Sequence, residues 1–471
     1  MSATDRRTFL KGTLLGGLGI GLGGGLASPE PAAARASNPS NPPSPSNTER
    51  AAHPVPEPYA APAGFAAPPI PLVRIGMVGV GLQGGSHVEN FLKIEGCEIV
   101  AVCDIDAPRA EEVAGWIVAA GRKKPELYTR GERDFERLCE RADLDLVFTA
   151  TPWEWHVPVC LAAMKAGKHA ATEVPAAYTV DACWELVETA EATLRHCVMM
   201  ENCCYGRSEM MVLKMVRSGL LGELLHAEGA YIHDLRAIKL AETSEGLWRW
   251  RHSTTRNGNL YPTHGLGPVA QCLDIQRGDA FDYLVSMSSP SRGLAAWARE
   301  HLPEGDPRKK ANFILGDMNS TLIRTRNGRT ILVQHDTCSP RPYSRLNLVQ
   351  GTKGTFSGYP DKIFVEGRTK EHVGWDDVET YRKEFEHPLW AENHAAAAGA
   401  GHGGMDFMED FRLIACLRAG SPLDLDVYDA AAWSVVTPLS EESVAHRSRP
   451  VDFPDFTRGR WKTRTPIGIV A

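Results

Sequence analysis

The stretch from Val73 to Asp104 reads VRIGMVGVGLQGGSHVENFLKIEGCEIVAVCD. Gly79, Gly81 and Gly84 follow the G-x-G-x-x-G spacing within it. Glycines at this spacing allow a tight turn, a close approach of the backbone to a pyrophosphate, and close packing of a helix on a strand. The stretch therefore predicts the turn of a dinucleotide-binding β–α–β unit.

The elements expected around these glycines are a strand over 73–78, a helix over 86–94 and a strand over 98–103. The helix N-terminus offers unpaired N–H groups to the phosphates. The second strand ends at Asp104, about 20 residues after the third glycine. A carboxylate there accepts hydrogen bonds from the adenosine ribose and repels a 2′-phosphate. NAD is therefore favoured over NADP.

Strands and helices continue to alternate up to about residue 205. Further strands are expected over 144–150, 169–172 and 197–202, and further helices over 157–166 and 180–194. Continuous apolar runs of this kind suit strands of a parallel sheet that is buried on both faces. The predicted fold class is α/β, with a doubly wound parallel Rossmann sheet over residues 71–205.

Loops that follow the carboxyl ends of parallel strands face the ligand crevice of such a sheet. Thr151–His156 (TPWEWH), Glu173–Pro175 (EVP) and Asn202 follow predicted strands in this way. Trp153–His156 can therefore contact the nicotinamide half of the dinucleotide. The alternative is that the two tryptophans are simply core residues.

The pattern changes after residue 206. Strands are expected over 224–233, 320–325, 330–334, 345–350 and 362–366, and helices over 209–217, 405–418 and 428–436. Asn327-Gly328, between two of these strands, is a strong hairpin signal. Residues 206–471 are therefore expected to form an α+β domain with a largely antiparallel open sheet. One face of this domain is expected to close over the crevice.

Several polar residues of the second domain are candidates for a site. Tyr261-Pro262-Thr263-His264 lies between glycine-containing turns, which predicts an irregular loop, and loops on rigid scaffolds are where functional residues gather. Tyr231 lies in a predicted strand, Arg249 lies between two tryptophans, and Tyr343 follows a strand. On residue type alone, a single tyrosine or histidine here is more often structural.

The segment before residue 71 predicts export. The sequence DRRTFLK (5–11) precedes an uncharged run over 12–27, which is typical of a twin-arginine signal peptide within 1–36. The alternative, a membrane anchor, is disfavoured because the run is glycine-rich and shorter than the roughly 20 residues that a span needs. Residues 37–70 are rich in Pro, Ala and Ser, which predicts a disordered tether. The protein is expected to be periplasmic or secreted, with the twin-arginine machinery as a partner.

Composition narrows the function classes. The formal net charge is −7 and the charges are mixed along the chain, so no basic face for nucleic acid is expected. The 11 cysteines are odd in number and lie mostly in apolar runs, which predicts buried thiols and not a disulfide framework. Cys203 and Cys204 have no C-x-x-C or histidine partner at ligand spacing, so no metal site is predicted.

The two crevice loops resemble those of the glucose-fructose oxidoreductase and inositol dehydrogenase family (Gfo/Idh/MocA). The T-P-x-x-x-H loop and the E-x-P turn occur here in that family's order. The family has E-K-P, and its lysine assists hydride transfer at a sugar carbon. Val174 replaces that lysine here, and a valine can neither shuttle a proton nor polarise a hydroxyl.

The sequence resembles one branch more closely, glycoside hydrolase family 109, whose members are NAD-dependent α-N-acetylgalactosaminidases. The motifs that carry this resemblance are GVGLQGGSHVENF (79–91), TPWEWHVPVC (151–160), TEVPAAYTVDACWELVE (172–188), MMENCCYGR (199–207) and GNLYPTHGLGPVAQ (258–271). It implies a substrate with terminal α-N-acetylgalactosamine. It also implies that the open face of the second-domain sheet can pair in a homo-oligomer.

The resemblance also assigns residues to the two ligands. The sugar pocket would be lined by Tyr231, Arg249, Tyr261, Pro262, Thr263, His264 and Tyr343. NAD would be contacted by Leu82, Gln83, Asp104, Trp153, Glu154, Trp155, His156, Glu173, Val174, Asn202 and Tyr261, in addition to the three glycines.

The chemistry explains why a hydrolase would hold NAD. The usual route needs two carboxylates that flank the anomeric carbon, and no such pair stands out in the loops of the second domain. Oxidation at C3 acidifies the C2 proton, and a base can then remove that proton while the C1 substituent leaves. Water addition at C1 and reduction at C3 complete the turnover. His264 is the candidate for acid/base work, because an imidazole titrates near neutral pH; Tyr261 can take the C3 hydroxyl proton or the C2 proton.

Two other functions remain open on the sequence. An NAD-dependent sugar or polyol dehydrogenase shares the fold, but Val174 and the export signal count against it. A non-catalytic sugar-binding protein that retains NAD as a structural element is the third reading. The intact segment Tyr261–His264 counts against that one.

Overall fold

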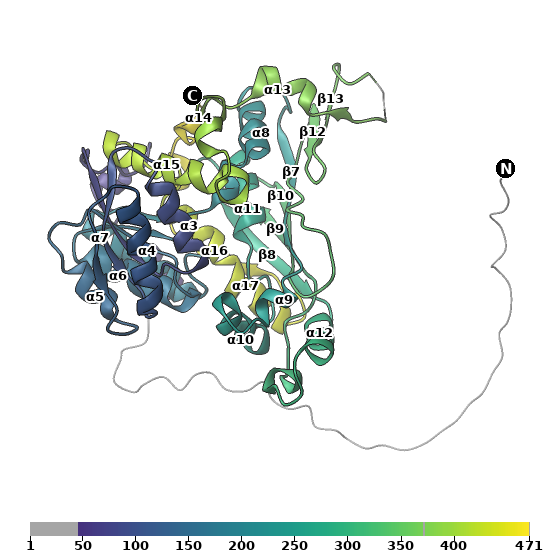
Figure 1. The fold of residues 1–471 in the computed structure, drawn as a ribbon. Helices are drawn as coiled ribbons and strands as arrows, with labels where there is room; N and C mark the ends of the chain where they lie inside the picture. The colour runs from purple at the N-terminus through teal and green to yellow at the C-terminus, as the bar shows by residue number, and fades with distance from the viewer. Residues whose placement is uncertain (1–45, 371–372, 471) are drawn as a thin grey trace, which may run out of the picture. The chain divides into compact units, whose positions relative to one another are not determined.

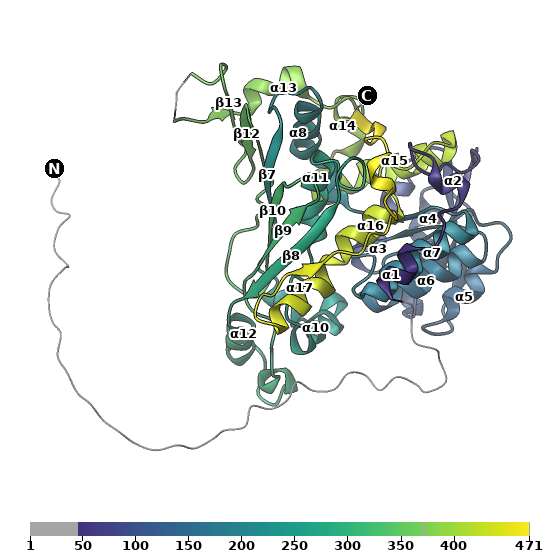
Figure 2. The same ribbon diagram turned by 180° about the vertical axis from the view of Figure 1, so that it is seen from behind.

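The computed structural model describes residues 46–370 and 373–470 (Figures 1 and 2). The predicted signal peptide, residues 1–36, lies outside the described residues, as does the first part of the predicted tether. No helix in the described ranges is both long enough and apolar enough to cross a membrane.

The first domain contains a six-stranded sheet with the order β3-β2-β1-β4-β5-β6, in which all neighbouring strands are parallel. Its strands are β1 (Val73–Val78), β2 (Cys97–Cys103), β3 (Glu126–Tyr128), β4 (Leu146–Thr149), β5 (His169–Thr172) and β6 (Cys197–Met199). This is the doubly wound order, which reverses direction between β1 and β4 and places a ligand crevice there. The predicted Rossmann sheet is confirmed.

The helices of this domain lie on both faces of the sheet (Figure 1). They are α3 (Leu82–Phe91), α4 (Ala107–Ala119), α5 (Asp134–Cys139), α6 (Trp153–Lys165) and α7 (Val180–Thr193). Helix α3 begins before the expected residue 86, because Gly84 is a helical residue and not part of the turn. A Cβ atom on Gly84 would lie 2.0 Å from the carbonyl oxygen of Gly79. The glycine is therefore required for close packing of the helix on the turn.

The second domain contains a nine-stranded sheet with the order β14-β13-β12-β11-β7-β10-β9-β8-β15. Its strands are β7 (Leu224–Ile232), β8 (Phe281–Ser288), β9 (Asn319–Thr325), β10 (Thr330–Asp336), β11 (Leu348–Gly351), β12 (Gly354–Ser357), β13 (Lys362–Val365), β14 (Asp376–Asp377) and β15 (Val451–Asp452). The predicted hairpin around Asn327-Gly328 joins β9 to β10. All pairs are antiparallel except β7 with β10, so the predicted antiparallel sheet is confirmed as a mostly antiparallel one.

Helices of the second domain pack on this sheet and also on the first domain. They are α8 (Arg207–Arg217), α9 (Arg236–Lys239), α10 (Arg249–Thr255), α11 (Thr263–Cys272), α12 (Gly293–His301), α13 (Glu379–Phe385), α14 (Pro388–Ala397), α15 (Met405–Ala419), α16 (Val427–Ser434) and α17 (Val436–Ala445). Helix α11 packs on β7 and α17 on β8, whereas α15 packs on α3 and α16 on α7. Figure 2 shows α16 and α17 in yellow between the two sheets. The late helices therefore join the two domains.

The prediction of a disordered tether over 37–70 is wrong for its described part, 46–70. That part contains the short helices α1 (Asn47–Ala51) and α2 (Glu57–Ala60). Tyr59 and Phe65 are buried, and their rings stack with centroids 4.5 Å apart. The N–H of Ile70 also donates to the carbonyl of Leu417 at 3.0 Å. A few buried aromatic side chains hold this Pro- and Ala-rich segment against the folded domains. Average composition does not show such single residues.

All eleven cysteines are buried as free thiols. Burial raises the pKa of several of these thiols, for example to about 12 for Cys97 and Cys103. The prediction of buried thiols without a disulfide framework is confirmed.

Candidate functional site

A cleft of about 500 Å³ lies between the crevice of the Rossmann sheet and the second domain. A cleft of this size falls in the range of cofactor and small-molecule sites. Most of the predicted site residues line it together: Gly79, Gly81, Leu82, Gln83, Asp104, Trp153, Glu154, Trp155, His156, Glu173, Val174, Asn202, Tyr231, Arg249, Tyr261 and His264. Gly84, Pro262, Thr263 and Tyr343 do not line it.

The glycine turn at one end of the cleft is shaped by close contacts. Gly79 has a φ of +79°, in the left-handed region that favours glycine, and a Cβ there would meet the carbonyl of Ala150 at 2.9 Å. A Cβ on Gly81, by contrast, would meet nothing within 4 Å, so its backbone is open to the cleft. No side chain caps the N-terminus of α3. Its first N–H groups are therefore available to a phosphate.

Asp104 braces the same turn. Its carboxylate accepts hydrogen bonds from the N–H of Val80 at 2.8 Å and from the N–H of Asp106 at 2.9 Å. Arg109 holds the turn from the other side, because its guanidinium donates to the carbonyls of Val80 and Gly81. A free helix N-terminus beside a fixed carboxylate is the arrangement that suits the pyrophosphate and ribose of a dinucleotide. These residues therefore fit NAD.

Trp153–His156 forms the first turn of α6 and not a loop, and Pro152 is the N-cap of that helix. Both ring nitrogens of His156 lie 2.8 Å from carbonyl oxygens, Nδ1 from that of Pro175 and Nε2 from that of Thr151. Burial lowers the pKa of this imidazole, against the effect of the two carbonyls. His156 therefore ties two crevice loops together. Trp153 stacks on Tyr261, with ring centroids 5.8 Å apart, and so joins the two domains at the cleft wall.

A buried polar network supports the cofactor side of the cleft. Glu173 accepts from the Nε2–H of His87 at 2.9 Å, and the Nδ1–H of His87 donates to Asp410 at 2.9 Å. Burial acts to lower the pKa of His87, but the two carboxylates outweigh it and hold the pKa well above the ordinary value. His87 is therefore an imidazolium between two carboxylates.

Helix α15, which carries Asp410, places a second carboxylate beside residues that were assigned to the cofactor. Asp406, on α15, accepts from the side-chain amide of Asn202 at 2.7 Å and from that of Gln83 at 3.3 Å. His402, which lines the cleft, lies 2.8 Å from the same carboxylate through its Nδ1 atom. The second domain therefore holds two side chains that were assigned to NAD from the first domain.

The segment around His264 differs from its prediction. Helix α11 begins at Thr263, so His264 stands in its first turn and not in an irregular loop. Gly265 is not a turn residue: a Cβ there would lie 2.1 Å from the amide nitrogen of Ala230 in β7. The glycine allows the helix and the strand to touch through their backbones. His264 is thus held on a rigid element.

Glu201 is the partner of His264. It lies immediately after β6, its side chain is 0% exposed, and its Oε1 accepts from the Nδ1–H of His264 at 2.7 Å. Burial acts to raise the pKa of Glu201, but the attraction and hydrogen bond of His264 outweigh it and hold the pKa below the ordinary value. The carboxylate is therefore charged. Since Nδ1 is engaged, Nε2 is the ring nitrogen of His264 that is left for a reactant.

Aromatic rings surround His264. The ring centroid of Tyr261 lies 4.8 Å from that of His264, and the centroid of Tyr231 lies 4.6 Å from that of Tyr261. Burial raises the pKa of Tyr261 well above its ordinary value, although the nearby Arg249 acts to lower it. Tyr261 is therefore a neutral phenol. Tyr343 stands outside this group, 38% exposed, with its ring centroid 6.3 Å from that of Tyr231.

Glu201, Cys203 and His264 also place three potential ligand atoms within 4.8 Å of one another. Nδ1 of His264 is already hydrogen-bonded to Glu201, and burial raises the pKa of the Cys203 thiol well above its ordinary value. A metal needs a thiolate from cysteine. The trio is therefore better described as a hydrogen-bonded acid–base pair beside a protonated thiol.

Comparisons with known proteins agree with this geometry. A family model described as "Oxidoreductase family, NAD-binding Rossmann fold" matches residues 73–201, and one described as "Glycosyl hydrolase 109, C-terminal domain" matches residues 205–463. The chain belongs to glycosyl hydrolase family 109. A family 109 protein of Shewanella pealeana is 51% identical over 421 residues, which cover 88% of this chain and 92% of that protein. One of Solibacter usitatus is 51% identical over 408 residues, with coverage of 86% and 93%.

Solved structures share the fold of this family 109 chain. A levoglucosan dehydrogenase in complex with NADH and L-sorbose has a TM-score of 0.65 and 20% identity, and covers 82% of this chain and 100% of its own. An inositol dehydrogenase homolog from Azotobacter vinelandii, complexed with NAD+, has a TM-score of 0.61 and 19% identity, with coverage of 82% and 99%. The family 109 chain is thus a glycoside hydrolase built on an oxidoreductase-like fold.

Sequence reasoning missed four buried groups of the site, Glu201, His87, Asp406 and Asp410, and the exposed His402. Glu201 could have been found, because it stands beside Asn202 at the carboxyl end of a predicted strand. His402 lies in a glycine-rich segment, which also marks a close approach of backbone. The other three lie in helices, where nothing local distinguishes them from solvent-facing polar residues.

Proposed function

We propose that this family 109 protein hydrolyses glycosides with terminal α-N-acetylgalactosamine and uses NAD as a cofactor that is regenerated in every turnover. The observation that carries the proposal is the pair of His264 and Glu201, which faces a dinucleotide cleft whose E-x-P turn has lost its lysine. The choice of sugar rests on the resemblance of the segment 258–271 to the family motif.

NAD would lie along the cleft. The glycine turn and the N-terminus of α3 would hold its pyrophosphate, and Asp104 would bind its adenosine ribose. Trp153 and Val174 would contact its nicotinamide. When bound, NAD supplies oxidation of the sugar at C3 and the reversal of that oxidation, which makes the C2 proton acidic while C3 is a ketone. These residues all follow the carboxyl ends of strands in the sheet of the first domain, namely β1, β2, β4 and β5.

His264 is the base in this proposal. Its Nε2 atom would take the C2 proton while the C1 substituent leaves and takes a proton from water. It would return a proton to C2 as the resulting hydroxide adds at C1. Glu201 stabilises the imidazolium that forms, because it is a buried carboxylate on the opposite ring nitrogen. It also fixes which tautomer is present before the reaction. A carboxylate in this place acts in the same way in Ser-His-Asp triads.

Tyr261 has a different role, since a phenol with a raised pKa stays protonated and can donate a hydrogen bond. It would donate to the oxygen at C3 and remain protonated, and the hydroxyl proton lost on oxidation at C3 would pass to water in the cleft. Arg249 supports this oxygen site with a positive charge, because its guanidinium lies 5.3 Å from the centre of the Tyr261 ring. Val174 offers no proton at the position of the family's lysine, so the tyrosine and the guanidinium are the groups that face the oxygen.

A conventional pair of catalytic carboxylates fits the cleft less well. Glu173 is bonded to His87 and to the N–H of Val174. Glu245 forms an ion pair with Arg249. Both carboxylates are thus already engaged by protein cations or donors, whereas a general acid must present its carboxyl to the leaving group.

The test is to incubate the purified protein, without added NAD, with a chromogenic α-N-acetylgalactosaminide in deuterated water. We expect release of the chromophore with deuterium at C2 of the sugar. Release without deuterium would overturn the elimination route. Net accumulation of NADH would indicate a sugar dehydrogenase instead.

Two variants test the roles of the residues. His264→Ala should abolish both turnover and exchange at C2. Tyr261→Phe should reduce turnover while exchange continues, because the base remains. Near-normal turnover in His264→Ala would remove the histidine from the mechanism, and an unchanged Tyr261→Phe enzyme would remove the tyrosine.

We also infer export by the twin-arginine route from the sequence DRRTFLK (5–11) and the uncharged run that follows it. This route carries proteins that have already folded, so the enzyme would cross the membrane with its cofactor in place. A resident cofactor also agrees with the chemistry, since no net redox change occurs.

A further inference from the structure

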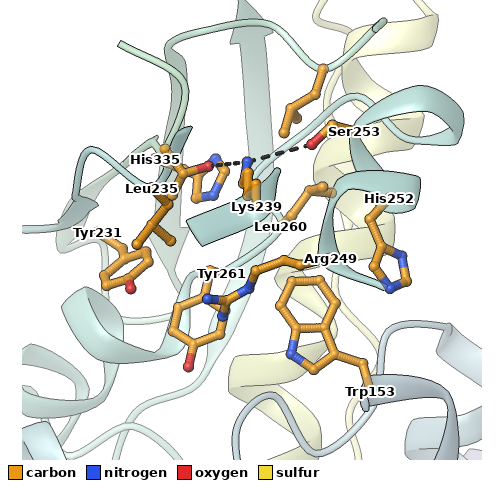
Figure 3. A pocket seen from close by; sticks show the side chains of 12 residues that line it. Trp153, Tyr231, Leu235, Lys239, Arg249, His252, Ser253, Leu260, Tyr261 and His335 are labelled. Carbon is orange, nitrogen blue, oxygen red and sulfur yellow. Dashed lines mark hydrogen bonds between the residues drawn. The ribbon is translucent and has the colours of Figure 1, made fainter. Parts of the chain in front are cut away.

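A small cavity lies behind one wall of the cleft (Figure 3). Trp153, Arg249 and Tyr261 line both the cavity and the cleft, and therefore form the wall between them. The cavity has a volume of about 10 Å³. This is room for one particle of about the size of a water molecule.

Lys239, at the end of α9, points into this cavity, and its side chain is buried with 4% exposure. Its ammonium donates to the hydroxyl of Thr337 at 2.6 Å and has longer contacts of 3.4 Å with Ser253 Oγ and Cys338 Sγ. None of these three partners is a carboxylate. Within the described ranges, no carboxylate forms an ion pair with this lysine. Burial lowers the pKa of Lys239 below its ordinary value, and the charge of Arg249 acts in the same direction, because a buried charge without a counter-charge is costly.

A second cation adds to the charge at the cavity. Arg249 is also buried, and its ion-pair partner, Glu245, lies on the cleft side of the wall and not in the cavity. Asp336, the carboxylate between His335 and Thr337, accepts hydrogen bonds from the N–H groups of Cys338 and Ser339 at 3.1 Å each. It is therefore turned into its own loop.

His335 completes the lining. Its Nδ1 atom is buried and has no hydrogen-bond partner among the described residues. Burial lowers the pKa of this imidazole well below the ordinary value, and the charges of Lys239 and Arg249 lower it further. The interior of the cavity is thus electrically positive, and a neutral imidazole can still donate one N–H.

We propose that the cavity between Lys239, Arg249 and His335 binds one small monovalent anion of the chloride class. An anion supplies the counter-charge that the lysine lacks, and it can replace the two long contacts of the ammonium. A water molecule could bond to His335 but would leave the charge uncompensated. Polyatomic anions such as sulfate are too large for the space. Because Arg249 is shared with the cleft, the anion also fixes the guanidinium that faces it.

The first test is the thermal stability of the full chain in a chloride-free buffer. Sodium bromide replaces sodium gluconate at constant ionic strength. In the wild type we expect Tm to rise and saturate, by about 1 to 2 °C at a tenfold excess over Kd. Lys239→Met, which keeps the length of the side chain, should show no saturable rise, and Lys123→Met, at an exposed position, should behave as the wild type.

The second test is direct. Crystals of the wild type in sodium bromide should give an anomalous bromide peak between Lys239 and His335, and crystals of Lys239→Met should not. A water in this place with no Tm response to bromide would overturn the proposal, as would an equal response in wild type and Lys239→Met. Neither readout depends on turnover, so these tests can contradict the anion site without contradicting the glycosidase activity, and the reverse also holds.

Discussion

Glu201→Gln is the sharpest perturbation that the site offers. The substitution keeps the shape of the side chain and removes only its charge. Glutamine Oε1 can still accept from the Nδ1–H of His264, so the ring should keep its position. What is lost is the negative charge that stabilises the imidazolium formed when His264 takes a proton.

The size of the effect follows from the burial of the pair. Hydrogen bonds to charged groups contribute about 1.5 to 3 kcal/mol. At about 1.4 kcal/mol for each factor of ten, kcat/KM should fall by about 10- to 160-fold. Since the imidazolium loses its anionic partner, the acidic limb of the pH profile of kcat/KM should move to lower pH.

The assay is the pH profile of kcat/KM with a chromogenic α-N-acetylgalactosaminide. Circular dichroism and Tm are measured on the same samples to show that the fold is retained. Glu185→Gln, an exposed glutamate on α7, is the matched control and should behave as the wild type. A folded Glu201→Gln enzyme with unchanged kcat/KM and an unchanged acidic limb would refute the role given to this pair.

Three further predictions concern the cofactor network, the N-terminal segment and export. His87→Gln should destabilise the protein most at low pH. The folded-state pKa of His87 is raised, so its contribution to the free energy of unfolding is fully present below about pH 6.5 and is lost as the pH rises through the folded pKa. Urea unfolding at several pH values checks this, and a destabilisation that grows with pH would contradict it. If the segment 46–70 is part of the core, Tyr59→Ala should lower the free energy of unfolding by about 3 to 5 kcal/mol, as for other buried aromatic residues. Calorimetry measures this loss. A Tm within about 1 °C of the wild type would argue for a tether. The double variant Arg6→Lys with Arg7→Lys should keep its activity but leave it in the cytoplasmic fraction, and activity that still reaches the periplasm would exclude the twin-arginine route.

The sequence determined much of the cofactor half of the molecule. The spacing of Gly79, Gly81 and Gly84, followed by a terminal acid, predicts the turn and its ligand because these requirements are local. One stretch of chain must make the turn, the helix N-terminus and the strand end. The alternation of apolar runs with helical segments likewise predicted the parallel sheet. For the same reason strand β1 was predicted residue by residue.

Errors arose where glycine serves packing and not turning. Gly265 and Gly267 appeared to be turn residues, yet both lie within helix α11. Each of them lets the helix approach a neighbouring strand or helix more closely than a Cβ would allow. Sequence alone cannot separate these two uses, because the neighbour that requires the glycine is distant in the chain.

The charged interior was decided only by the tertiary structure. His264 and Glu201 are 63 residues apart, His87 and Asp410 are 323 apart, and Lys239 and Thr337 are 98 apart. Each of these side chains meets a partner that only the fold brings to it, inside a low-dielectric interior. The sequence therefore determined the dinucleotide-binding type of fold, and the packing of the two domains decided which side chains meet in the cleft.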